Sequence, residues 1–434
     1  MRTSAYSVLS AIVITLFAIA TVFLPELVKT FQITVCLFIA ICLFDFIGLR
    51  QLVDIKVTRQ VNKNIPIYSW TEVTLRIQHN YNSTLQLAVH DYHPSHFLVQ
   101  GQPHTFSLPP KLVSEIRYRV KPLQRGDAQF SGIDLLITSP FRLWKKRLHL
   151  QLDDQVHVYP NFSEIVHFAL LAIDNHLSQM GVRRRQRRGE GQDFLQLREY
   201  RFGDSIKQID WKATSRYQKL ISREYQDERD QQIIFLIDCG RRMRHVENGQ
   251  AHLDQALNAM LLLSYVAIRQ GDAAGFLSFA GTERWVPPRK GAHVVNSLLN
   301  QAYDLPSTTE TADYIGVANK LVGLQRKRAM VVILTNTRDE DQTDLKKAAK
   351  LLSRRHLVVL ADLREPELNE ASENPVTDLD SALLFHGVMD YLHRRKQEHE
   401  ILQHAGAICI DTTAEELPVR LINQYLAIKR SGKL

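Results

Sequence analysis

The chain has 434 residues, of which 45% are apolar and 23% are charged, a balance typical of folded proteins with two or three domains. Lys and Arg number 54 against 46 Asp and Glu, and this small, partly local excess does not by itself indicate nucleic-acid binding. The four cysteines, Cys36, Cys42, Cys239 and Cys409, lack metal-ligand spacing and imply no disulfide framework, which fits a reducing compartment.

Two apolar runs open the chain. Residues 6–24 contain no charged residue, and residues 31–49 contain one, Asp45, close to the end of the run. Each run has about the length at which a helix spans the hydrocarbon core of a bilayer, and residues 25–30 are too few for anything but a tight connection. The sequence therefore predicts a transmembrane hairpin within residues 1–50, with Asp45 near enough to its end to reach the headgroups.

The charges beside the hairpin predict its orientation. Arg2 precedes the first run, Arg50, Lys56 and Arg59 follow the second, and the connection carries one Glu and one Lys. By the positive-inside rule, both termini and the soluble body lie in the cytoplasm, at the inner (cytoplasmic) membrane. An alternative is a signal peptide cleaved near residues 18–20, in which case the second run still anchors the chain.

Residues 51–160 lack long helical periodicity. Polar and apolar residues alternate, as they do in half-buried antiparallel strands, over residues 71–77, 114–120 and 155–159. This pattern predicts a small β-sandwich-like domain. Three histidines surround Asp91 in a stretch that is typical of a surface loop and lacks the spacing of a zinc site.

Residues 231–434 show apolar strands that alternate with helices. The predicted strands are residues 233–237, 274–279, 330–334, 357–361 and 408–410. Near-continuous apolar strands between helices indicate a mostly parallel sheet covered on both faces, an α/β fold of Rossmann type. Ligands bind beyond the carboxyl ends of such strands, so Asp238, after the first strand, is a candidate site residue. Residues 382–403, which include Arg395, are predicted to form an amphipathic surface helix.

The most distinctive segment, residues 161–230, lies between these two domains. It contains the motifs Gly189-Glu190-Gly191-Gln192-Asp193-Phe194, Leu197-Arg198-Glu199-Tyr200, Gly203-Asp204 and Ile209-Asp210-Trp211-Lys212-Ala213. With Ser139-Pro140-Phe141 before it and Asp238-Cys239-Gly240-Arg241-Arg242-Met243 after it, the chain closely resembles the bacterial "domain of unknown function 58" family. The likeness covers nearly the whole chain and departs at Lys207 and Ser139, where the family usually has Arg and Asp.

This resemblance implies a von Willebrand A-like domain in a membrane-anchored protein. It also implies a partnership with MoxR-type ATPases of the AAA+ class, and it implies no established reaction. Other membrane proteins are further expected partners, whereas neither nucleic acid nor a small-molecule substrate is indicated.

The signature residues mix opposite charges with aromatic rings, so two roles stay open. They form a network that locks the segment onto a neighbouring domain, the usual role of surface ion pairs and aromatics, or they present a surface that docks a partner. The residues concerned are Gly189, Gly191, Phe194, Leu197, Arg198, Tyr200, Gly203, Asp204, Asp210, Trp211 and Arg216.

The resemblance also invites comparison with metal-binding von Willebrand A domains. These offer D-x-S-x-S after the first strand, a Thr from a second loop and an Asp from a third. Asp238 is retained, and the two serine positions read Gly240 and Arg242. Thr311 or Thr309 is the candidate for the second-loop hydroxyl, and the third-loop position reads Thr335-Asn336. An arginine about 5 Å from a divalent ion repels it by several kcal/mol at an effective dielectric of about 20. We therefore predict a degenerate site without metal or cofactor, in which Arg241 or Arg242 pairs with Asp238.

A basic run precedes Gly189 and consists of Arg183, Arg184, Arg185, Arg187 and Arg188. Such a run suits anionic lipid headgroups, at about 1 kcal/mol per residue near the surface, or an acidic partner. A solvated surface loop is an equal alternative.

The sequence contains no G-x-S-x-G nucleophile motif and no G-x-x-x-x-G-K-[ST] phosphate loop, so no enzyme class is indicated. The leading hypothesis is a membrane-tethered, non-enzymatic adaptor that docks a cytoplasmic MoxR-type AAA+ ATPase, in envelope-protein assembly, maturation or stress tolerance. The alternative is a metal-dependent binding or hydrolytic module that uses Asp238 with Asp204 and Asp210.

Overall fold

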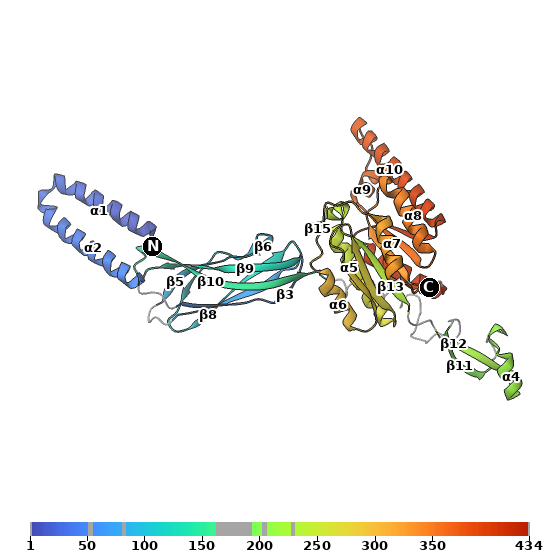
Figure 1. Cartoon of the computed structure of the whole chain (residues 1–434). Helices are drawn as coiled ribbons and strands as arrows, with labels where there is room; N and C mark the ends of the chain where they lie inside the picture. The colour runs from blue at the N-terminus through green and yellow to red at the C-terminus, as the bar shows by residue number, and fades with distance from the viewer. Residues whose placement is uncertain are drawn as a thin grey trace. The chain divides into compact units, whose positions relative to one another are not determined.

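The computed structural model describes residues 2–50, 55–79, 84–161, 193–201, 206–226 and 231–432. The chain divides into two compact units, Met1–Tyr159 and Pro160–Leu434 (Figure 1). The first unit contains the apolar hairpin and a β-domain. The second contains the signature segment and an α/β domain.

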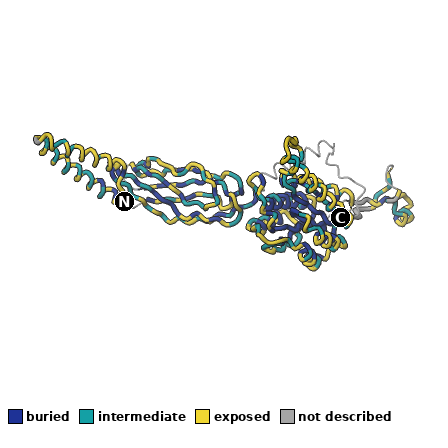
Figure 2. Tube along the Cα trace, turned by 90° about the horizontal axis from the view of Figure 1, so that it is seen from above, coloured by how far each residue is buried: buried dark blue, intermediate teal, exposed yellow. Residues whose placement is uncertain are grey.

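The apolar runs form two helices, α1 (Ala5–Phe23) and α2 (Val28–Arg50), connected by the 3₁₀ turn η1 (Pro25–Leu27). Their 19 and 23 residues extend about 28 and 34 Å, close to the ~30 Å of a bilayer's hydrocarbon core. No residue of α1 is buried, and most residues of the hairpin are exposed or half-buried (Figure 2). As predicted, both helices are long and apolar enough to cross a membrane, which is consistent with an anchor.

Two mostly antiparallel sheets form the β-domain. One has the order β1-β10-β9-β5-β7, with β3 beside β10, and the other has the order β2-β4-β8-β6. Every second residue of β4 from Val73 to His79 is buried, which matches the predicted alternation, and both sheets contribute to one apolar core. The strands are β1 (Arg2–Thr3), β2 (Ile55–Gln60), β3 (Asn64–Pro66), β4 (Thr71–His79), β5 (Leu85–Asp91), β6 (Phe97–Gln100), β7 (His104–Leu108), β8 (Val113–Pro122), β9 (Gly126–Thr138) and β10 (Trp144–Tyr159).

A buried ion pair lies inside the β-domain. Arg59 donates through Nε to Asp91 Oδ2 at 2.9 Å and through Nη1 to Asp154 Oδ2 at 2.8 Å. The Tyr118 hydroxyl donates to Asp91 Oδ2 at 2.5 Å, and the side chains of Arg59 and Asp91 are fully buried. The expectation that Asp91 lies in a surface loop is therefore wrong, because Asp91 ends strand β5 and points into the core.

The described part of the signature segment is a small hairpin with a helix. Strand β11 (Asp193–Glu199) pairs antiparallel with β12 (Ile221–Gln226), and η2 (Ile206–Gln208) and α4 (Trp211–Tyr217) lie between them in the chain. Asp210 caps α4, since its Oδ1 accepts a hydrogen bond from the Ala213 backbone N–H at 3.0 Å.

The main sheet of the α/β domain has the order β17-β16-β13-β18-β19-β20, and in it only β17 is antiparallel to its neighbour. A two-stranded sheet of β14 (Val246–Glu247) and β15 (Gln250–Ala251) lies in the same domain. The five predicted strand segments fall within β13, β16, β18, β19 and β20. The strands are β13 (Gln232–Asp238), β16 (Ala273–Phe279), β17 (Trp285–Arg289), β18 (Met330–Thr335), β19 (Leu357–Arg364) and β20 (Ala407–Thr413).

Helices cover both faces of this sheet. Ile233, Phe235 and Ile237 of β13 pack with α5, α6 and α11, whereas Ile234 and Leu236 pack with α7, α8 and α10. Burial on both faces explains why the strands are continuously apolar (Figures 1 and 2). The helices are α5 (His252–Arg269), α6 (His293–Ala302), α7 (Tyr314–Leu324), α8 (Gln342–Ser353), α9 (Glu367–Glu373), α10 (Leu379–His404) and α11 (Leu417–Ser431).

The strand order of the α/β domain reverses at β13. The chain passes from β13 to β16 on one side and later to β18 on the other side. In open α/β sheets such a reversal leaves a crevice at the carboxyl ends of the two central strands, where ligands bind. Here that crevice lies beyond Asp238 and Thr335.

Candidate functional site

A cleft of about 440 Å³ lies at this carboxyl edge of the sheet. One wall comes from the 3₁₀ turn η3 (Arg241–Arg244) after β13, and the other residues follow β18 and β19. The lining residues are Arg241, Arg242, Arg244, His245, Asn336, Arg338 and Glu365. Four arginines against one carboxylate make the cleft an anion-binding candidate.

Three of the four arginines have carboxylate partners. Arg242 forms ion pairs with Glu340 and Asp341, and Arg241 Nη2 lies 2.7 Å from the exposed Glu340 carboxylate. Arg338 pairs with Glu365 and donates to the Tyr391 hydroxyl.

Arg244 differs from these three, because it is exposed and has no ion pair among the residues that the structure describes. The Arg241–Glu340 pair is also exposed, so exchanging its carboxylate for another costs little. Arg244 and Arg241 are thus the guanidinium groups most available to an incoming anion.

Buried polar atoms lie beside the cleft. Asn336 is 1% exposed and donates through Nδ2 to Glu365 at 3.0 Å, but its Oδ1 has no hydrogen-bond partner among the described residues. His252 stacks edge-on against His245, with ring centroids 4.7 Å apart. Burial, helped by the nearby His245, lowers the pKa of His252 to about 4, so its ring is neutral at pH 7. The cleft therefore combines arginine donors with one buried acceptor.

Asp238 lies at the end of β13 and is 2% exposed. Its Oδ1 accepts from the Gly240 N–H at 2.8 Å, and its Oδ2 accepts from the Thr335 hydroxyl at 2.7 Å. Burial raises the pKa of Asp238, and the Thr335 and Gly240 hydrogen bonds and the charge of Arg242 act against this rise. The predicted ion pair of Asp238 with Arg241 or Arg242 is wrong, because those arginines pair with Glu340 and Asp341.

The other positions compared with a metal site do not converge on Asp238. A Cβ added at Gly240 would lie 2.8 Å from the Glu310 carbonyl oxygen, so a serine does not fit there without a backbone shift. Thr311 is exposed, and the Asn336 side chain is bonded to Glu365. Of the third-loop pair Thr335-Asn336, Thr335 is the residue that contacts Asp238, through its hydroxyl. Among the described residues, no group of three or more His, Cys, Asp or Glu side chains could hold a metal ion.

Neither magnesium nor manganese is expected to bind saturably to the full-length protein. Both Asp238 oxygens already accept hydrogen bonds, and Arg242 adds a repelling charge. Calorimetric titration with each cation, repeated on Asp238→Ala, is the measurement, and neither protein should show saturable binding. Saturable binding that disappears in Asp238→Ala would refute the degenerate-site prediction and support the metal-dependent alternative.

The structure describes only some of the signature residues. Gly189, Gly191, Gly203, Asp204 and the five arginines from Arg183 to Arg188 lie outside the described residues, and Phe194 is described only as part of strand β11. Of the predicted carboxylate pair, Asp210 is thus the described member. Its Oδ2 lies 2.8 Å from Arg223, and the Ala213 N–H, followed by Arg223, lowers the pKa of Asp210. Asp210 therefore serves local structure.

The signature hairpin exposes several large apolar side chains. Trp211, at the first position of α4, is 65% exposed, and Arg198 and Tyr200 bond locally to backbone atoms of the same hairpin. Arg216 is also exposed. Exposed apolar groups of this kind often mark contact surfaces. The large apolar side chains exposed here are Leu197, Ile206, Trp211, Tyr217 and Leu220.

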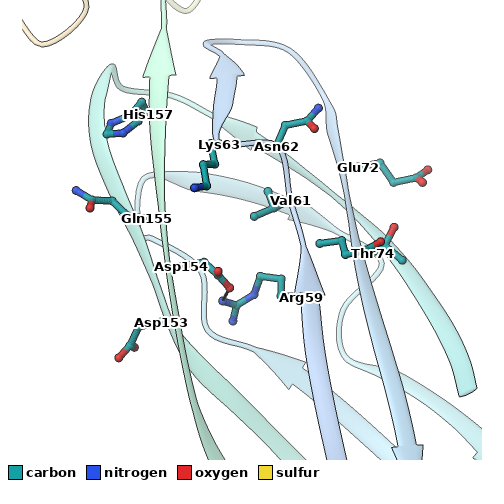
Figure 3. A pocket seen from close by; sticks show the side chains of 11 residues that line it. Arg59, Val61, Asn62, Lys63, Glu72, Thr74, Asp153, Asp154, Gln155 and His157 are labelled. Atoms are coloured by element: carbon teal, nitrogen blue, oxygen red, sulfur yellow. Dashed lines mark hydrogen bonds and ion pairs between the residues drawn. The ribbon is translucent and has the colours of Figure 1, made fainter.

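A second hollow, of about 730 Å³, lies in the β-domain (Figure 3). Its lining includes Arg59 and Asp154, whose charges already pair with each other, and Arg59 also pairs with Asp91. His157 lies 2.6 Å from Asp127. The hollow therefore ranks below the arginine-rich cleft as a binding site.

Comparison with known proteins gives a family but no activity. The family model "Protein of unknown function DUF58" matches residues 196–404. The uncharacterized protein YeaD of Bacillus subtilis (strain 168) is 22% identical over 259 residues, which are 58% of this chain and 61% of that protein. The chain thus spans less than two thirds of the length of that relative.

Similar solved structures each cover 24% of this chain. A FixG-related protein from Vibrio parahaemolyticus is 10% identical, matched over 98% of its length, with a TM-score of 0.19. The CARDB domain of the PF1109 protein from Pyrococcus furiosus, in complex with two metal ions, is 15% identical, matched over 87% of its length, with a TM-score of 0.19. Scores this low carry no argument about this chain. The family model and the YeaD relative together identify the chain as a member of the DUF58 family of proteins of unknown function.

Proposed function

We propose that this protein is a membrane-anchored, non-enzymatic adaptor that docks a partner protein at the arginine-rich cleft. The expected partner is a cytoplasmic MoxR-type AAA+ ATPase, in envelope-protein assembly, maturation or stress tolerance. The observation that carries the proposal is a basic cleft at the strand-order reversal of the sheet, with Arg244 free of ion pairs among the described residues.

The α/β domain is proposed to be von Willebrand A-like, with a Rossmann-type sheet. The order of the parallel strands and the position of Asp238 at the end of the first strand support this assignment. The cleft then occupies the edge at which such a sheet binds ligands.

The chemistry of the cleft favours a carboxylate on the partner. A guanidinium group matches a carboxylate with two parallel hydrogen bonds, and such charge-assisted bonds are the strong ones. Arg244 would form an ion pair with an acidic side chain of the partner. Arg241 would exchange its exposed partner Glu340 for the same side chain. Asn336 Oδ1 offers an acceptor for an N–H of the same partner segment.

The membrane topology is part of the proposal. Arg2, Arg50 and Lys56 flank the hairpin on the side of the soluble body, and under the positive-inside rule they support an orientation with both termini in the cytoplasm. The exposed Trp211 and Ile206 of the signature hairpin support a second contact with the partner rather than a purely structural lock.

Neutralising the cleft is expected to release the partner. Full-length protein is purified from mildly solubilised membranes with ATP hydrolysis blocked, and bound proteins are identified. Wild type should retain the ATPase, and the Arg241→Gln/Arg244→Gln variant should bind it about tenfold more weakly or worse, because each charged hydrogen bond contributes about 1.5–3 kcal/mol. Arg354→Gln is the matched control, since this exposed arginine follows α8 at the opposite edge of the sheet.

Three outcomes separate the alternatives. If the double variant retains the ATPase but Trp211→Ala loses it, the signature hairpin is the docking surface and the cleft is not. If neither change has an effect, both surfaces are excluded. If wild type recovers no ATPase, the adaptor proposal fails, and the module that uses Asp238 with Asp204 and Asp210 takes precedence.

A further inference from the structure

The turn between β9 and β10 is fixed to the end of α2. Asp45 on α2 is 2% exposed and accepts hydrogen bonds from the Ser139 hydroxyl at 2.5 Å and from the Phe141 N–H at 3.2 Å. The Trp144 indole N–H donates to the Cys42 carbonyl oxygen at 3.1 Å. The hydrogen bonds of the Asp45 carboxylate, on the mostly apolar helix α2, therefore come from the β-domain. Separating α2 from the β-domain would leave this carboxylate without hydrogen-bond donors.

The start of the hairpin is fixed to the same turn. The Ser4 N–H donates to the Leu143 carbonyl oxygen at 2.9 Å, and β1 pairs with the first residues of β10. The Phe46 ring packs edge-on against Trp144, with centroids 5.5 Å apart. Both ends of the hairpin are thus held by residues 139–145, so this turn cannot move independently of the helices.

The position of Asp45 along α2 indicates how deep in the bilayer the turn between β9 and β10 lies. Asp45 is 17 residues from Val28, which is about 25 Å along the helix, against about 30 Å for the hydrocarbon core. If α2 spans a bilayer, the atoms that bind Asp45 therefore lie near the boundary between the acyl chains and the headgroups.

Aromatic side chains gather at this depth. Phe141 is 55% exposed and Phe44 is 72% exposed, and their rings are 6.5 Å apart. Trp144, three residues after Phe141, packs against Phe46 of the same helix α2. Aromatic residues are enriched at the membrane–water interface, where their rings lie at headgroup level.

Cations border the same turn. Lys146 Nζ lies 3.5 Å from the Leu49 carbonyl oxygen, at the end of α2. Arg2, Arg50, Arg142 and Lys145 have no ion pair among the residues that the structure describes. Unpaired cations next to an apolar hairpin attract the phosphate groups of anionic lipids.

We propose that residues 139–145 form a membrane-seating element. Phe141 and Phe44 lie in the interfacial layer of the bilayer, and Arg2, Arg142 and Lys145 bind the phosphates of anionic lipids. The β-domain then contacts the lipid headgroups directly, without a flexible linker between it and the membrane. This inference rests on the hairpin crossing the membrane, and it does not depend on the docking partner.

The test places a trifluoromethyl-phenylalanine probe at position 141 of the full-length protein in phosphatidylglycerol-containing nanodiscs. The fluorine signal should be lost with nitroxide-headgroup lipids and kept with a soluble paramagnetic agent. Trp70 is the matched control position, because it is also exposed and Ile67, three residues before it, bonds to Tyr159 at the other end of β10. A probe at Trp70 should respond only to the soluble agent.

Two changes sharpen the result. In Asp45→Ala the probe at Phe141 should become more sensitive to the soluble agent, because the Ser139 hydroxyl and the Phe141 N–H lose their acceptor on α2 while Trp144 keeps its bond to Cys42. In Arg142→Gln/Lys145→Gln the phosphatidylglycerol that co-purifies with the protein should fall, and an unchanged amount would refute the lipid-phosphate contacts.

A probe at Ile39, within α2, distinguishes the modes of failure. If Ile39 is shielded from the soluble agent while Phe141 behaves like Trp70, the hairpin is inserted and the seating proposal is overturned. If the soluble agent also reaches the probe at Ile39, the hairpin does not span the bilayer. The membrane-seating proposal is then refuted, and the outcome of the ATPase co-purification experiment is unaffected.

Discussion

Asp91→Ala is expected to lower the free energy of unfolding of the β-domain by about 3–5 kcal/mol, because removing one partner of a buried ion pair leaves the other charge uncompensated. Arg59 is fully buried, and the carboxylate partner that it would retain among the described residues is Asp154, which is 36% exposed. The Tyr118 hydroxyl would lose its acceptor as well.

The loss of unfolding free energy is measured by urea unfolding of the full-length protein in detergent. Hydrogen exchange of the backbone amides of β4 and β9 follows the unfolding of the β-domain separately from that of the α/β domain. Asp153→Ala is the control, since Asp153 is exposed on β10 and its replacement should change stability by less than about 0.5 kcal/mol. Replacing the pair by Arg59→Met/Asp91→Leu should cost less than Asp91→Ala alone. If Asp91→Ala and Asp153→Ala lower the free energy of unfolding by equal amounts, the buried Arg59–Asp91 ion pair does not stabilise the β-domain.

Asp362→Ala is expected to destabilise the α/β domain by about 3 kcal/mol, for the same physical reason. Asp362 is fully buried at the end of β19 and lies 2.8 Å from both Arg395 Nη2 and His399 Nε2 of α10. Arg395 would keep a second carboxylate, Asp411, at 3.2 Å, which places the loss at the lower end of the usual range. Thermal unfolding measures the effect, and the exposed Asp344→Ala on α8 is the control.

The stability contributed by Asp362 should depend on pH in a defined direction. Burial opposes ionisation of Asp362, but Arg395 and His399 outweigh it and hold its pKa below the usual range. A depressed pKa contributes stability above the unfolded value of about 4, and that stability is lost as the pH falls through the folded pKa. The difference between wild type and Asp362→Ala should therefore shrink below about pH 4. A difference that grows on acidification would contradict this account.

The partners of buried polar residues could not be predicted from sequence. Most of α10 is exposed or half-buried, as the prediction of a surface helix has it. Arg395, in a charged stretch of that helix, is nevertheless 2% exposed at the carboxyl edge of the sheet, and the sequence does not indicate this. Asp238 was identified from its place after an apolar strand, but its partner Thr335 lies 97 residues away. Such contacts depend on strand order and register, and no local pattern contains either.

The sequence by itself determined the features that depend on neighbouring residues. The apolar runs that form α1 and α2 and the strands β13, β16, β18, β19 and β20 follow from local hydrophobicity, because burial of a segment requires continuous or alternating apolar side chains. The family likeness likewise follows from the signature motifs and is shown by the match over residues 196–404.

Only the tertiary structure decided what the polar residues do. Packing of the sheet places Arg241 and Arg244 opposite Asn336 and Arg338 around one cleft, although these residues are far apart in the chain. In the first unit, the tertiary structure joins Asp45 in the hairpin to Ser139 in the β-domain. The physical reason is that a buried charge or hydrogen-bonding group must find its partner wherever the fold brings one, and the fold is set by the packing of whole elements.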